Sequence, residues 1–185
     1  MAAPDSRNIK NLNGAWVMNK TLSDDPDPIL ALQGVGWLIR KAISYATITL
    51  HIKQYVGEDE PGQPTHIDIE QKATGGISGT TERRTLDWQE RGHTDGIFGA
   101  VTGRSRWTKL EDVEDPFLKK GWLEAEAKEN GVVQSYVESD GNGWTANQIW
   151  GFEEIDGNRY YVRHVVVTKE DERREARLVY DFSAE

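Results

Sequence analysis

Residues Asp27–Ser44 read DPILALQGVGWLIRKAIS, and this stretch decides the fold. Its apolar residues recur at helical spacing on both sides of Gly34–Gly36, which predicts two short helices separated by a sharp turn. Asp27 is a good N-cap residue, and Pro28 suits the first helical turn, where no backbone N–H is needed. Each predicted helix is too short to be stable alone, so both must pack against the rest of the chain.

Nearly every other segment has the signature of a β-strand. Gly14–Thr21, which contains Trp16, precedes the helical pair, and Ala46–Tyr55 follows it with strict alternation of apolar and polar residues. The later strands are predicted at Thr65–Thr74, Gly79–Trp88, Gly96–Leu110, Val132–Ser139, Trp144–Ile155, Arg159–Thr168 and Ala176–Phe182, with Gly96–Leu110 as two strands or one bent strand. About ten hairpin-connected strands predict an all-β protein, a closed antiparallel up-and-down β-barrel. The helix-turn-helix after the first strand would form a small lid.

One domain accounts for most of the chain. Residues 1–11 are interpreted as a flexible N-terminal tail, and residues 12–185 as a single barrel domain. The charged segment 111–131 contains Pro116 and interrupts the strand rhythm. It is therefore interpreted as an insertion between strands, with at most one helical turn.

Composition excludes several classes of function. The 185 residues include 22 Lys and Arg against 31 Asp and Glu, and the net charge of −9 argues against nucleic acid as a partner. The chain has no cysteine, and its histidines lack metal-binding spacing, so neither a metal nor a cofactor is predicted. The N-terminus has no apolar leader, and no stretch approaches the ~20 apolar residues that span a bilayer. We expect a cytoplasmic monomer without stable membrane insertion.

Four features, taken in order, resemble the intracellular fatty-acid-binding proteins of the calycin superfamily, a lipocalin-like barrel family. Gly14–Trp16 resembles the G-x-W of the family's first strand, and Gly34–Lys41 its second helix, G-V-G-aromatic-x-x-R-K. Asp156-Gly157 resembles the turn of its penultimate hairpin, and Tyr180 the tyrosine of its C-terminal R-x-Y. The resemblance implies a ten-stranded barrel that binds an apolar small molecule and is gated by the two helices.

The sequence departs from this family at the anion-binding arginines. Leu178 and Phe152 occupy the two positions where the family has arginines that hold a carboxylate. Arg177 lies one residue away from Leu178, which in a strand turns it to the opposite face. By the same alternation Tyr161 and Arg163 point inward, so Arg163 is the candidate for a relocated cation.

The candidate ligand-binding residues follow from these strand faces. Trp37 and Ile43, on the second helix, are expected to gate the mouth. Alternatively, the aromatic residues fill an ordinary barrel core, because a small barrel must be filled by something. No catalytic residue is predicted, since no paired acid and base or nucleophile motif is present. The remaining candidates are Ile48, Leu50, Trp107, Tyr136, Gln148, Trp150, Phe152, Tyr161, Arg163, Leu178 and Tyr180.

Two main functions remain open at the level of sequence. The leading hypothesis is an intracellular carrier that binds a lipid, a fatty acid or an apolar secondary metabolite through burial of apolar surface. The alternative is an enzyme of the cyclase or isomerase type, which folds an apolar metabolite by positioning and hydrogen bonding. A structural or protein-interaction role is the third hypothesis.

Overall fold

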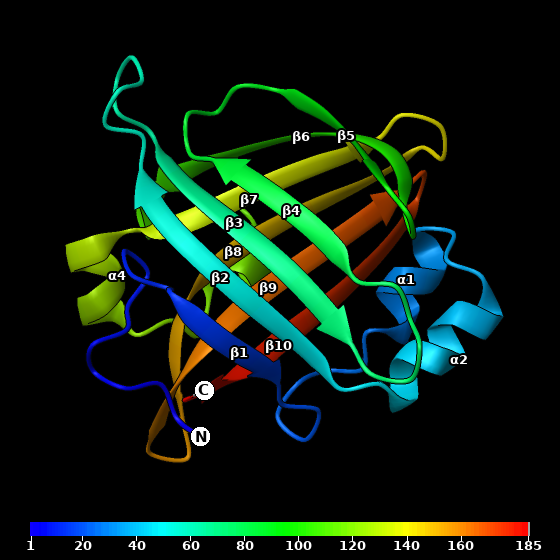
Figure 1. Ribbon diagram of the computed structural model, residues 1–185, viewed down its shortest axis with the longest axis horizontal. Coiled ribbons are helices and arrows are strands. Elements are labelled where there is room, and N and C mark those ends of the chain that lie inside the picture. The colour runs from blue at the N-terminus through cyan, green and yellow to red at the C-terminus, as the bar shows by residue number, and fades with distance from the viewer. Residues whose placement is uncertain (185) are drawn as a thin grey trace.

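The alternating segments pair into one antiparallel sheet of ten strands in the order β4-β3-β2-β1-β10-β9-β8-β7-β6-β5. The computed structural model describes residues 1–184, and Figure 1 shows the sheet curling round into a barrel. The strands are β1 Gly14–Met18, β2 Ile48–Val56, β3 Thr65–Ala73, β4 Thr80–Thr85, β5 Arg91–Asp95, β6 Gly99–Thr108, β7 Val132–Ser139, β8 Trp144–Ile155, β9 Asn158–Lys169 and β10 Glu172–Ser183. The predicted fold class is confirmed.

The barrel is nearly closed rather than fully closed. No ladder joins β4 to β5 among the residues that the structure describes. Instead, Leu86 forms an isolated parallel bridge with Ser105 of β6, which ties the two sides of the seam together. The sequence did not predict β5 as a separate strand, because its residues RGHTD carry no apolar alternation and four of the five are exposed.

The helical pair covers one end of the barrel (Figure 1). Helix α1 spans Asp27–Leu32 and α2 spans Trp37–Tyr45, and Gly34 between them has a φ of 83° that favours glycine. Pro26 rather than Asp27 occupies the N-cap position of α1, and Asp27 instead accepts a hydrogen bond from Arg40 Nε at 2.9 Å. No residue of α2 is buried, so this helix rests lightly on the barrel.

The N-terminal segment is not the free tail that the sequence suggested. Ala3 and Ile9 are buried, and the N–H of Ala3 donates to the carbonyl oxygen of Arg159 at 2.7 Å. The segment ends at Leu12, which is fully buried in the same core cluster as Trp16 of β1. Its apolar residues therefore seal the end of the barrel opposite the lid.

The insertion between β6 and β7 is more helical than predicted. A 3-10 turn at Leu110–Asp112 is followed by α3 at Pro116–Lys119 and α4 at Glu124–Asn130. The segment packs on the outer face of the barrel, where Trp122 and Leu118 join a second apolar cluster with Val162. At most one helical turn was predicted because the segment is mostly charged, and Trp122 and Leu118 alone do not mark a helical face. None of the helices within residues 1–184 is long and apolar enough to cross a bilayer.

Candidate functional site

The interior of the barrel is divided into a hollow half and a filled half. The hollow half is a cavity of about 960 Å³ beneath the helical lid. Its lining runs from Ile29 and Leu30 of α1, through Ile48 of β2, to Val165 of β9 and Tyr180 of β10. A volume of this size lies at the upper end of the range typical of small-molecule sites.

The filled half is a floor of packed aromatic rings. Trp16 lies at its centre, with ring centroids 5.3 Å from Tyr161, 6.1 Å from Phe152 and 5.0 Å from Phe182. The indole N–H of Trp16 donates to the carbonyl oxygen of Leu12 at 2.8 Å, which fixes the ring against the N-terminal segment. Tilted and edge-to-face arrangements of this kind favour a rigid floor.

Arg163 stands where the floor meets the cavity. Its side chain projects inward from β9, is 5% exposed and lines the cavity. Nε donates to the hydroxyl of Tyr161 at 2.8 Å, and the guanidinium carbon lies 4.0 Å from the ring centroid of Trp150. The Nη2 nitrogen is buried and has no hydrogen-bond partner. A buried cation with an unused donor is costly unless another acceptor completes the site.

The two tyrosines beside Arg163 are neutral phenols. Burial raises the pKa of Tyr161 well above its ordinary value, although the positive charge of Arg163 opposes that shift. Burial also raises the pKa of Tyr180, whose ring centroid is 5.4 Å from that of Tyr161. Both phenols therefore remain protonated at neutral pH.

An acidic group faces the same cavity from β4. Glu82 pairs with Ile69 of β3 across the sheet, which turns its side chain inward, and its Oε2 accepts from Arg84 Nη2 at 3.1 Å. Burial raises the pKa of Glu82, but the charges of Arg84 and Arg163 more than offset this effect, so the pKa lies below its ordinary value. The carboxylate is therefore ionised at neutral pH.

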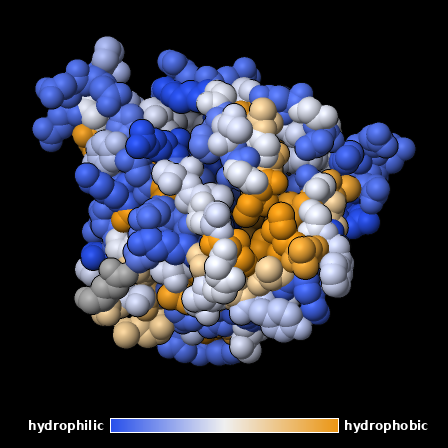
Figure 2. All heavy atoms as spheres, turned by 45° about the vertical axis from the view of Figure 1, so that its right-hand side comes forward, coloured by the Kyte–Doolittle hydropathy of each residue, from blue (hydrophilic) through white to orange (hydrophobic). Residues whose placement is uncertain are grey.

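The rim of the cavity carries an exposed apolar groove. Figure 2 shows an orange cluster on the side of the molecule where the helices cover the barrel. A groove of about 390 Å³ there lies between α2 and the loops that follow β3 and β5. Its apolar lining residues are Leu38, Ile39, Ala42, Ile77 and Ile97. The cavity thus reaches the surface beside the lid.

The predicted site residues fall into three groups in the structure. Six line the cavity: Ile43, Ile48, Gln148, Arg163, Leu178 and Tyr180. Five belong to the packed part of the barrel interior: Leu50, Trp107, Trp150, Phe152 and Tyr161. The interior therefore combines the two possibilities left open by the sequence, since one half is a cavity and the other half is core.

The remaining two predicted residues lie outside the barrel. Trp37 is 67% exposed and does not line the cavity, so only Ile43 of the expected pair is placed to act as a gate. Tyr136 shares a face of β7 with Glu138, to which its hydroxyl donates at 2.8 Å, while Val133, Ser135 and Val137 face inward. The alternation of β7 was predicted one residue out of phase.

Sequence reasoning missed the acidic side of the cavity. Glu82 and Arg84 lie in the polar segment TTERRT, which has no apolar residue to mark its inner face. The available signal was the neighbouring strand: Ile67 and Ile69 face inward, and they pair with Arg84 and Glu82. Residues paired directly across a sheet share a face.

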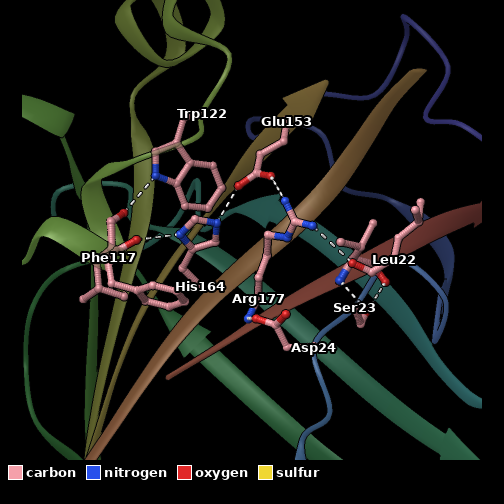
Figure 3. Close-up of polar contacts among 10 residues, drawn as sticks. Leu22, Ser23, Asp24, Phe117, Trp122, Glu153, His164 and Arg177 are labelled. Atoms are coloured by element: carbon pink, nitrogen blue, oxygen red, sulfur yellow. Dashed lines mark hydrogen bonds and ion pairs between the residues drawn. The ribbon is translucent and has the colours of Figure 1, made fainter. Parts of the chain in front are cut away.

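A second buried polar cluster lies on the outer side of the barrel wall (Figure 3). His164 Nδ1 donates to the carbonyl oxygen of Phe117 at 2.8 Å, and Nε2 lies 2.5 Å from Glu153 Oε1. The Trp122 ring packs against the imidazole at a tilt of 36°, with a centroid distance of 4.3 Å. Arg177 extends the cluster to Glu153 at 3.4 Å. These contacts attach the insertion to β8, β9 and β10, and they do not line the cavity.

Comparison with curated proteins gives two relatives along nearly the whole chain. The chain is 34% identical to "Probable pericyclase scpY" from Mollisia scopiformis over 183 residues, covering 98% of this chain and 94% of the relative. It is 32% identical to "Pericyclase pydY" from Acremonium sp over 184 residues, covering 98% of this chain and 97% of the relative. No protein-family model matches the chain.

Solved structures with the same fold are fatty-acid-binding protein-like calycin barrels. The REP1-NXSQ fatty acid transporter aligns with a TM-score of 0.56 at 19% identity, over 94% of this chain and 97% of that one. The Caenorhabditis elegans lipid binding protein 8 aligns with a TM-score of 0.60 at 15% identity, over 92% and 94%. At these identities the likeness shows the fold alone, which is the barrel that the sequence resemblance implied.

Proposed function

The chain belongs to the family of these pericyclases, and we propose that it catalyses a pericyclic isomerisation of a hydrophobic polyene inside the barrel cavity. Such a reaction rearranges bonds through one cyclic transition state and leaves the mass of the substrate unchanged. It needs no covalent intermediate. The protein has to fold the chain into the reactive shape and to stabilise the charge that develops on a conjugated carbonyl oxygen.

The unused donor of Arg163 is the observation that carries the proposal. A carbonyl oxygen of the substrate would accept from Nη2, which has no partner within the described residues. A hydrogen bond from a cation withdraws electron density from a conjugated carbonyl, and this accelerates a cyclisation in which that alkene is the electron-poor partner. The hydrogen bond from Arg163 Nε to Tyr161 at 2.8 Å and the stacking on Trp150 fix the guanidinium before substrate arrives.

The shape of the cavity supports the other requirement, the folding of the chain into the reactive shape. Ile29, Ile48 and Leu178 supply apolar walls, and the rigid aromatic floor stops a long chain from lying fully extended. A chain longer than the depth of this cavity of about 960 Å³ has to bend back on itself to stay enclosed, which brings its reacting ends together. Positioning of this kind contributes up to about 7–11 kcal/mol to well-oriented intramolecular reactions.

The test uses linear polyene ketones that carry a diene and an enone in one chain. The purified protein is incubated with each ketone in the presence of EDTA and without any added cofactor. The expected result is a cyclic product of unchanged mass that forms faster than in buffer and with one stereochemical outcome. If no ketone in a series of increasing chain length shows either a rate increase or a stereochemical bias, the proposal is wrong.

A carrier function is the second candidate, because the barrel fold is shared with fatty-acid transporters. The same incubation separates the two functions. A carrier binds a polyene and returns it unchanged, whereas an enzyme returns the cyclic isomer. Native mass spectrometry of the protein with bound ligand, followed by chromatography of the released ligand, distinguishes the two compounds despite their equal mass.

A further inference from the structure

Glu82 is an unusual side chain for the wall of an apolar cavity. It projects inward from the edge strand β4, and its side chain is 27% exposed although it lines the cavity. An ionised carboxylate in such surroundings is costly unless it is paired. Its only hydrogen bond within residues 1–184 uses Oε2, which accepts from Arg84. The other oxygen, Oε1, is free to accept from a ligand.

The positive charges near Glu82 outnumber its single negative charge. Glu82 contributes −1, while Arg84 and Arg163 contribute +1 each, so these three side chains together carry a net charge of +1. The guanidinium carbons of Arg84 and Arg163 lie 6.0 and 4.0 Å from the ring centroid of Trp150, and Arg84 donates to Glu82. The cavity therefore presents cationic donors and an anionic acceptor to the same ligand.

We propose that Glu82 accepts a hydrogen bond from the substrate, so that the substrate is a hydrophobic chain whose head group offers an N–H or O–H donor beside a carbonyl acceptor. This inference rests on the proposed function, because it assigns the head group to the substrate of the same cavity. The carbonyl accepts from Arg163 Nη2, which is buried and unpartnered. An ionised carboxylate can only accept, so any ligand group that binds the free Oε1 of Glu82 must be a donor.

The alternative role for Glu82 is to balance the charge of Arg84 without contacting a ligand. The two roles differ in what they predict for ligands. A charge-balancing carboxylate affects all ligands that carry a carbonyl to a similar extent. An accepting carboxylate distinguishes a head group that has a donor from an otherwise similar one that lacks it, because a site built for a donor is left unsatisfied by the analogue.

The experiment measures binding of dodecanamide and methyl dodecanoate by displacement of 1-anilinonaphthalene-8-sulfonate from the cavity. Both probes have the same apolar chain and a carbonyl, but only the amide has N–H donors. The wild-type protein is expected to bind the amide at least about tenfold more tightly than the ester, as a charge-assisted hydrogen bond implies. A ratio within about twofold overturns the proposal.

Two variants connect the preference to Glu82. Glu82→Gln keeps the shape and leaves a neutral acceptor, so it is expected to lower the amide-to-ester ratio while retaining part of it. The double variant Glu82→Leu/Arg84→Leu removes the carboxylate together with its partner and avoids an unpaired arginine. It is expected to bring the ratio within about twofold of unity. A double variant that keeps the wild-type ratio overturns the proposal.

The outcome is independent of catalysis. A protein that prefers the amide but converts no polyene ketone supports the head-group assignment and contradicts the proposed reaction. A protein that converts polyene ketones but shows no preference between amide and ester supports the reaction and contradicts the role of Glu82. The two results use different measurements, an equilibrium displacement and a rate.

Discussion

Replacing Arg163 with Met tests whether the guanidinium acts on the substrate or only fills space. Methionine keeps much of the length and volume of the side chain and removes the charge. If the substrate carbonyl accepts from Nη2, the variant loses one charge-assisted hydrogen bond, which contributes about 1.5–3 kcal/mol. That range corresponds to a reduction of about 10- to 150-fold in kcat/KM.

The effect on stability is expected to be smaller, because its components oppose one another. The variant loses the hydrogen bond to Tyr161 and the stacking on Trp150. It also removes a buried charge and an unpartnered N–H, either of which destabilises the folded state. We therefore expect the free energy of unfolding to change by no more than about 2 kcal/mol.

The assay is the initial rate of cyclisation of a polyene ketone over a range of concentrations, together with urea unfolding followed by tryptophan fluorescence. Arg163→Lys is the matched control, because it keeps the positive charge and loses the planar fork. Its kcat/KM should lie between those of the wild type and Arg163→Met. A folded Arg163→Met variant with wild-type kcat/KM would show that the guanidinium does not contact the reacting group.

Three further predictions concern the lid and the insertion. Ile43→Trp narrows the mouth of the cavity, so uptake of an apolar fluorescent probe should slow several-fold in stopped-flow experiments, with little change in the melting temperature. Gly151→Ala should lower the free energy of unfolding by about 1–3 kcal/mol in urea, because a Cβ would lie 2.8 Å from Trp122 Cε3; an unchanged value would mean that the indole moves freely. Asp115 caps α3 and binds Arg173 at 2.7 Å, and the hydrogen bond from Arg173 holds the pKa of Asp115 below its ordinary value. The stabilisation by Asp115 is therefore present above the ordinary carboxyl pKa and is lost as the pH falls through the lowered pKa. Asp115→Ala should lower the free energy of unfolding by about 1 kcal/mol at pH 7 and by progressively less below about pH 4. A decrease that does not vary with pH would contradict this account.

The sequence predicts the barrel well, because apolar alternation along strands such as β2 records which face is buried. It predicts the lid because two segments with helical spacing of apolar residues are separated by glycines, a pattern typical of two short helices joined by a turn. Prediction from the sequence fails where polar side chains face the interior of the barrel. Glu82 and Arg84 face inward from a strand without apolar residues, and only their pairing with β3 reveals it.

The division of the barrel into cavity and floor could not be predicted from side-chain types. Trp150 and Gln148 lie on the same face of β8, yet Gln148 borders the cavity while Trp150 belongs to the packed floor. The difference arises from the N-terminal segment, where Ile9 and Leu12 fill one end of the barrel. A residue's depth along the barrel axis depends on this distant part of the chain, and periodicity carries no information about it.

The sealed end has a consequence for turnover. Leu12 and Trp16 close the far side, so a molecule that enters beside α2 cannot pass through the barrel and leave at that end. Under the proposed function, a flexible chain would pass through a narrow opening end first, whereas the ring system made from it would be stiffer and wider. The opening must therefore be wide enough for the cyclic product. An opening that admits the linear chain freely can still be too narrow for the ring. Release of the product through the shared opening, rather than ring closure, would then be the rate-limiting step of turnover.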